Sequence, residues 1–259
     1  MSSGVVPGVF ARRIERETTP PPGHGERFAG YGVMGIPFST GHVLALRRFP
    51  ASSLGPGYTA VWYRDPAGAW EIYADVPPEL SCSRFFGAAL SRSVETAIAL
   101  TWSDEWTLEI SLPAAELTWR VHLTETWVTR WLNRLMPVLP DAAWRSPTTL
   151  HAIEWVAAAA LGVGRLRLQG TTPNGHSFLA RPRLLWAVSS SSAALGNVDL
   201  GAPEPLATPA QLGQFLIPQR GLFVIGAATF ARDAGRSLVP ARPRSLHGAA
   251  PVAAAGRNT

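Results

Sequence analysis

The sequence predicts a mainly β protein, an antiparallel meander that forms a barrel or a strongly curved sheet, with two helices inserted around residues 126–162. Between the two ends of the chain, apolar residues recur mostly at every second position, which is the period of a strand. Short turns rich in Pro, Gly and Asn separate these stretches. The strands come before and after the helical segment and do not alternate with it, which argues against a parallel α/β sheet.

The clearest alternation lies in residues 96–124, where two turns separate three strands. Closing the first turn sets Leu100 opposite Leu108, and closing the second sets Glu109 opposite Arg120. A slip of one residue would send every side chain to the other face, so the agreement of both turns favours a three-stranded meander.

An earlier hairpin turns at residues 65–68, where Pro and Gly occupy the positions that a type I turn favours. Its predicted register sets Tyr63 opposite Trp70 and places Trp62 and Tyr73 on one face. Both faces of this hairpin carry aromatic side chains, which a sheet with one solvated face rarely needs. One face therefore lines a pocket or packs against a helix, and the sequence leaves both readings open.

Two segments switch to the helical period. Residues 126–136 form a short amphipathic pattern that ends at a proline. The second helix has Ser146 as its N-cap, Pro147 at its first position and Gly162 after its end.

We expect a loosely ordered N-terminal segment at 1–27, a single antiparallel β-rich domain at 28–231 and a disordered basic tail at 232–259. The tail contains five arginines and one acid and therefore holds most of the net charge of +5. The rest of the chain is nearly neutral and lacks the basic face of a nucleic-acid reader, so no nucleic-acid partner is expected.

Composition excludes several kinds of chemistry. All 23 basic residues are arginine, so the chain has no lysine for a Schiff base, a pyridoxal phosphate linkage or a P-loop. Cys82 is the only cysteine, which excludes an intramolecular disulfide and a cysteine-based metal cluster. No signal peptide and no apolar run long enough to span a membrane stand out, so we expect a cytoplasmic protein without a membrane span.

The candidate catalytic residues are His42, His122 and His151, because imidazole exchanges protons near neutral pH. No histidines have a recognised zinc spacing, and the pair of His151 and Glu154 supplies only two ligands, so no metal and no cofactor are expected. For His122 the simpler interpretation is a solvated cross-strand ladder on the polar face of the meander.

The aromatic meander strands at 58–65 and the late strand at 183–188 resemble those of the lipocalin-like (calycin) β-barrels, including their carotenoid-hydratase-like relatives. The resemblance extends over about residues 30–230. It implies an apolar metabolite held in a cavity, where it is carried or chemically rearranged. No motif matches position by position, so the resemblance transfers no catalytic residue.

The sequence therefore suggests binding of an apolar small molecule in an aromatic-lined barrel cavity, with isomerisation, cyclisation or hydration as the candidate reactions. The ten tryptophans and the two-faced hairpin motivate this, and the candidate ligand-binding residues are Trp62, Tyr73 and Trp186. The alternative is a non-enzymatic interaction or structural protein that oligomerises, for example as a homodimer, through exposed aromatic surface. Whether the chain is an enzyme stays open.

Overall fold

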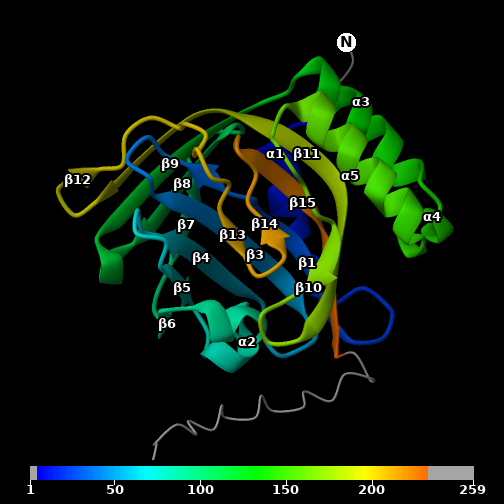
Figure 1. Ribbon diagram of the computed structural model, residues 1–259, viewed down its shortest axis with the longest axis horizontal. Coiled ribbons are helices and arrows are strands. Elements are labelled where there is room, and N and C mark those ends of the chain that lie inside the picture. The colour runs from blue at the N-terminus through cyan, green and yellow to red at the C-terminus, as the bar shows by residue number, and fades with distance from the viewer. Residues whose placement is uncertain (1–4, 233–259) are drawn as a thin grey trace, which may run out of the picture.

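The computed structural model describes residues 5–232, which form a strongly curved, mainly antiparallel sheet with helices packed around it (Figure 1). The main path through the sheet runs β6-β5-β4-β3-β1-β15-β11-β9-β8-β7. The path ends at β6 on one side and at β7 on the other. The sheet is therefore open, and its curvature makes it a half-barrel. The predicted fold class, mainly β with helices inserted near 126–162, is confirmed.

The strands of this path are β1 (Glu26–Val33), β3 (Val43–Ser52), β4 (Tyr58–Arg64), β5 (Trp70–Ala74), β6 (Arg92–Glu95), β7 (Ala99–Trp102), β8 (Thr107–Leu112), β9 (Leu117–Thr124), β11 (His176–Leu195) and β15 (Leu222–Arg232). Short strands at its margins are β2 (Ile36–Pro37), β10 (Gln169–Thr171) and β12 (Val198–Asp199), and a separate hairpin pairs β13 (Gln211–Leu212) with β14 (Phe215–Leu216). The helices are α1 (Pro7–Ile14), α2 (Ser83–Phe86), α3 (Trp127–Leu135), α4 (Asp141–Arg145) and α5 (Pro147–Leu161).

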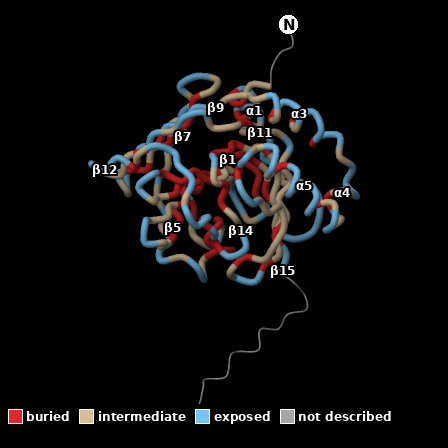
Figure 2. The backbone as a smooth tube through the Cα atoms, turned by 45° about the horizontal axis from the view of Figure 1, so that its top comes forward, coloured by how far each residue is buried: buried red, intermediate tan, exposed pale blue. Residues whose placement is uncertain are grey.

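Each face of the sheet carries its own apolar core, because neighbouring residues of a strand point to opposite faces. On β3, Leu44 and Leu46 belong to a core that α1 covers, and we call this side of the sheet the α1 face. Val43 and Ala45 of the same strand belong to a second core, which α2 and the β13–β14 hairpin cover, and we call this side the α2 face. The buried segments gather in the middle of the molecule (Figure 2).

The meander of β7, β8 and β9 confirms one predicted register and corrects the other. Glu109 faces Arg120, as predicted. Leu100 faces Ile110 and not Leu108, because the turn closes with the N–H of Ser103 donating to the carbonyl oxygen of Thr107. This shift of two residues leaves each side chain on its predicted face.

The predicted register of β4 with β5 is wrong by one residue. Trp62 faces Ile72, and Val61 faces Tyr73. The N–H of Asp65 donates to the carbonyl oxygen of Ala69, so three residues form the loop, and the last, Gly68, has a φ of 101°. A three-residue loop that ends in a left-handed glycine adds one residue to the predicted turn. Trp62 and Tyr73 consequently lie on opposite faces of the sheet.

The second predicted helix begins and ends where the sequence indicates. Ser146 accepts a hydrogen bond from the N–H of Thr149, and Gly162 ends α5 with a φ of 62°. The first of the two predicted helices corresponds to α3, and polar contacts hold it to the sheet. The side-chain amide of Asn133 bonds both the N–H and the carbonyl of Leu185. The buried side of α3 therefore carries Thr129 and Asn133, and its tryptophans face outward.

The N-terminal segment packs onto the α1 face. Within residues 1–27, which we predicted to be loosely ordered, Pro7–Ile14 form α1, and Ala11 is fully buried. The indole N–H of Trp186 donates to the carbonyl oxygen of Val5. The predicted tail lies outside the described residues from 233 onward. No helix between residues 5 and 232 is long and apolar enough to cross a membrane.

Candidate ligand-binding cavity

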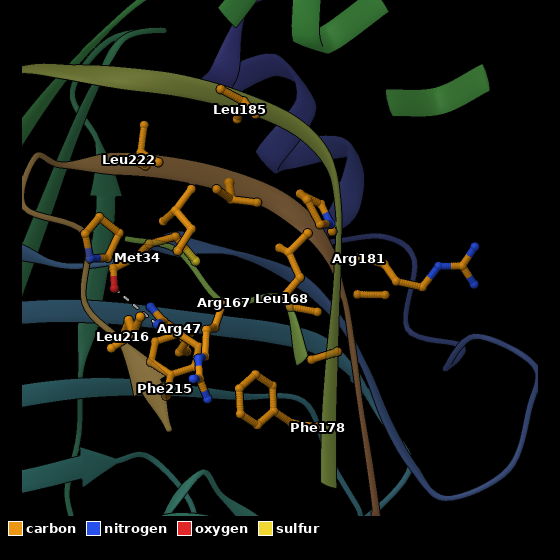
Figure 3. A pocket seen from close by; sticks show the side chains of 18 of the residues that line it. Met34, Arg47, Arg167, Leu168, Phe178, Arg181, Leu185, Phe215, Leu216 and Leu222 are labelled. Atoms are coloured by element: carbon orange, nitrogen blue, oxygen red, sulfur yellow. Dashed lines mark hydrogen bonds between the residues drawn. The ribbon is translucent and has the colours of Figure 1, made fainter. Parts of the chain in front are cut away.

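A cavity of about 160 Å³ lies on the α2 face, between the sheet and a cover formed by α5 and the β13–β14 hairpin. Figure 3 shows part of its lining, including Arg47, Phe178 and Phe215. Strands β1, β3, β4, β11 and β15 contribute to its wall. Most of the lining is apolar, and its aromatic members on this face are Phe49, Trp62, Phe86, Phe178, Phe215 and Phe230. Such a lining, with few polar groups, is typical of a small-molecule site.

Two paired glycines in the cavity wall let neighbouring strands approach closely. Gly30 of β1 and Gly226 of β15 are register partners, and both line the cavity. A Cβ at Gly30 would lie 1.9 Å from the carbonyl oxygen of Arg48, and one at Gly226 would lie 2.4 Å from that of Arg181. The neighbouring pairings of β1 and β15 both shift register at this level, which bends the sheet. Only glycine fits this close backbone approach.

One charged side chain stands in the apolar wall. Arg47 of β3 is 6% exposed, and its Nη1 donates to the carbonyl oxygens of Val33 (2.7 Å) and Leu46 (2.8 Å). Its Nη2 donates to the carbonyl oxygen of Met34 at 3.3 Å. Figure 3 shows this side chain beside Phe215. Burial lowers the pKa of Arg47 to about 10, so the guanidinium stays protonated at neutral pH.

The polar groups around Arg47 carry no negative charge at neutral pH. Tyr58 and Cys82 are buried, with 3.3 Å between the hydroxyl oxygen and the sulfur. Burial raises the pKa of Tyr58 well above its ordinary value. Burial also raises the pKa of the Cys82 thiol, although the Tyr58 hydroxyl and the Arg47 guanidinium offset part of that increase. A thiol with a raised pKa is a poor nucleophile, so Cys82 has a packing role.

Three further charged residues line the cavity. Glu154 of α5 is buried and accepts a hydrogen bond from the N–H of Leu168 at 2.6 Å. Arg167 donates to the side-chain oxygen of Gln214 at 3.2 Å. The side chain of Arg181 points away from the cavity (Figure 3) and pairs with Asp141.

The structure separates the three predicted ligand-binding residues. Trp62 lines the cavity. Tyr73 and Trp186 belong to the core of the α1 face, so they lie across the sheet from Trp62 and do not line the cavity. The one-residue error in the β4–β5 register explains why Tyr73 was grouped with Trp62.

The three predicted catalytic histidines do not line the cavity either. His42 lies 2.8 Å from the hydroxyl of Thr40, and burial lowers its pKa. His122 is exposed and bonds Thr107, as a cross-strand ladder would. His151 is exposed on α5. Within the part of the chain that the structure describes, no three His, Cys, Asp or Glu side chains gather as a metal site.

Sequence reasoning missed Arg47 and the β13–β14 hairpin, and it considered Glu154 only as a metal ligand beside His151. A signal for Arg47 does exist, since two arginines stand together in the apolar strand Val43–Ser52. Alternation sends them to opposite faces, and at least one must therefore point into a core.

No protein-family model and no curated protein matches the chain. Among solved structures, the chain is similar to acetoacetate decarboxylase from Legionella pneumophila, with 12% sequence identity and a TM-score of 0.36. The match covers 90% of this chain and 96% of the other.

Proposed function

We propose that the chain binds a small apolar molecule in the cavity on the α2 face. The observation that carries this proposal is the cavity itself, about 160 Å³ in volume and lined mainly by aromatic and aliphatic side chains. An engineered apolar cavity of roughly 150 Å³ holds benzene. The volume is below the roughly 300 Å³ that drug-sized ligands need, so the expected ligand has a body close to one aromatic ring or a short alkyl chain.

Isomerisation, cyclisation or hydration of the bound molecule remains our proposal for its chemistry. Such reactions need a group that gives or takes a proton at the substrate. Glu154 is the carboxylate that lines the cavity, and His42, His122 and His151 do not line it. Glu154 therefore replaces the histidines as the acid–base candidate.

Filling the cavity tests the proposed binding. Ala228 lines the cavity from β15, so Ala228→Leu places a larger side chain in the ligand volume. Ala97→Leu, at an exposed position, is the matched control. We expect saturation-transfer NMR to detect 2-phenylethanol or phenylacetate on the wild type and on the control, and to lose the signal with Ala228→Leu. Absence of both signals from the wild type would refute the proposed binding.

A second candidate function, self-association, is favoured by a different observation. Trp127 and Trp131 of α3 and Trp155 of α5 are 74%, 64% and 74% exposed. Large exposed apolar areas mark interaction surfaces. The proposal is that these helices form an interface between copies of the chain.

A further inference from the structure

An apolar ligand leaves one feature of the cavity unexplained, namely the unpaired positive charge of Arg47. Ion pairs among residues 5–232 join Arg48 to Glu15 and Arg84 to Glu26, but none includes Arg47. Arg47 is far more deeply buried than either of these paired arginines, whose side chains are 23% and 34% exposed. A buried charge without a counterion destabilises a fold, so a functional reason for it is expected.

The lining residues supply no counterion for this charge. Tyr58 and Cys82 are the groups whose charge would act on Arg47, and burial raises the pKa of both, so both stay neutral at neutral pH. Glu154 lines the same cavity but makes no ion pair with Arg47, since its carboxylate accepts from the N–H of Leu168.

The hydrogen bonds of Arg47 leave one edge of the guanidinium free. The group has five N–H donors. Both donors of Nη1 and one of Nη2 are used by the carbonyl oxygens of Val33, Leu46 and Met34. The two donors without a partner among the described residues are the Nε–H and the second Nη2–H. An Nε–H and an Nη2–H on the same edge of a guanidinium point in parallel, and a carboxylate accepts such a pair through its two oxygens.

A second donor without a strong acceptor belongs to the same wall. Trp62 is 1% exposed, and its indole N–H has no partner in the described part of the chain other than the sulfur of Cys82, a weak acceptor. Its ring centre lies 4.8 Å from the guanidinium carbon of Arg47, and that of Phe215 lies 5.4 Å away. Buried donors are nearly always paired in native proteins, so the indole N–H beside the free donors of Arg47 indicates a missing acceptor.

We infer that the ligand is a small organic acid with an apolar body, whose carboxylate binds the free edge of Arg47 next to the indole N–H of Trp62. This inference rests on the proposed function and names its ligand class. The aromatic lining holds the apolar body, while the carboxylate neutralises the buried charge and satisfies the open donors.

Two probes of similar size and shape test the inference. Phenylacetate carries a carboxylate, and 2-phenylethanol carries a hydroxyl in its place. We expect calorimetry at pH 7.5 to show phenylacetate binding to the wild-type chain at least tenfold more tightly than 2-phenylethanol. Arg47→Met should abolish this preference and leave the affinity for 2-phenylethanol within about twofold. Arg120→Met is the matched control, because Arg120 does not line the cavity and its side chain is 60% exposed, and it should retain the preference.

Trp62→Phe provides a second variant that keeps the aromatic wall and removes only the N–H. It should reduce the preference for phenylacetate severalfold. If Arg47→Met fails to fold, Trp62→Phe still tests the inference. Equal affinity of the wild type for the two probes, or a preference that survives both variants, would overturn the carboxylate assignment and leave the proposed apolar site standing. Binding of neither probe would overturn both.

Discussion

The guanidinium carbon of Arg47 lies 4.8 Å from the centre of the Trp62 ring, so a buried cation stacks against an aromatic face. The two side chains come from neighbouring strands, β3 and β4, and point to the same face of the sheet. Phe215 reaches the same guanidinium from the β13–β14 hairpin, far along the chain. The two rings hold the plane of the Arg47 guanidinium in place, and the backbone carbonyls of Val33 and Leu46 accept hydrogen bonds from its Nη1. Together these contacts orient the N–H donors that remain free.

Shortening Phe215 should weaken the cover of the cavity. Phe215 contacts the rings of Trp62, Phe86 and Phe178 as well as Arg47. Because the side chain is half-buried, we expect Phe215→Ala to lower the free energy of unfolding by about 2 kcal/mol, less than the usual value for a fully buried phenylalanine. Urea denaturation measures this. Phe215→Leu keeps most of the volume and should cost less than half as much; equal losses would mean that the ring contacts add nothing.

Removing the carboxylate of Glu15 should loosen α1 from the sheet. Burial raises the pKa of Glu15, but the hydrogen bonds from Arg48 and Tyr31 outweigh it and lower the pKa overall. Glu15→Ala leaves both partners without this acceptor and should cost about 2 kcal/mol, measured by urea denaturation. Glu17→Ala breaks only an exposed pair with Arg13 and should cost less than about 0.5 kcal/mol. Equal costs for the two variants would contradict this role of Glu15.

His176 should make the fold sensitive to acid. Both of its ring nitrogens are buried without a hydrogen-bond partner in the described residues, and the ring packs edge-on against Phe85. Burial lowers its pKa below the ordinary value of 6.5, although the nearby Glu26 opposes this shift. Since the unfolded chain binds the proton more tightly, the stabilisation is complete above about pH 6.5 and is lost as pH falls toward the folded pKa.

The His176→Phe variant tests this pH dependence. It should keep the ring packing and lose less stability than the wild type between pH 7 and pH 5, measured by urea denaturation at each pH. Each unit by which folding lowers the pKa corresponds to about 1.4 kcal/mol. His151→Phe, at an exposed position, should keep the wild-type pH dependence. Identical pH profiles for His176→Phe and the wild type would assign the acid sensitivity to other groups.

Alternation and turn length explain how far the sheet could be predicted. The β8–β9 register was predictable because both strands alternate strictly and the turn between them offers one way to close. The β4–β5 register was not, because Asp65–Gly68 fits a four-residue turn as well as a longer loop, and only the left-handed φ of Gly68 decides between them. The extra loop residue places Tyr73 on the opposite face of the sheet from Trp62.

The site was less predictable than the sheet because it depends on contacts between distant segments. Arg47 and Arg48 are adjacent and chemically equal in the sequence. Arg48 is neutralised by Glu15, which reaches it only because α1 packs on the α1 face. Arg47, on the other face, pairs with no carboxylate among residues 5–232. Which arginine would stay unpaired depends on where α1 docks, and no local pattern contains that information.

The exposed tryptophans of α3 and α5 predict that the chain self-associates. Burying these rings removes a large apolar area from water, so we expect light scattering after size exclusion to show a mass that rises with concentration. The double variant Trp131→Ser with Trp155→Ser should stay monomeric. Because both side chains are more than half exposed, its unfolding temperature should match the wild type.

Val198→Ser is the matched control for this experiment. Val198 is 55% exposed on β12, so the change removes apolar surface outside α3 and α5 and should leave the concentration dependence intact. A wild-type chain that stays monomeric at every concentration would refute the second candidate function, and the apolar face of these helices would then need a different partner. Self-association that persists in the double variant would instead place the contact on another surface.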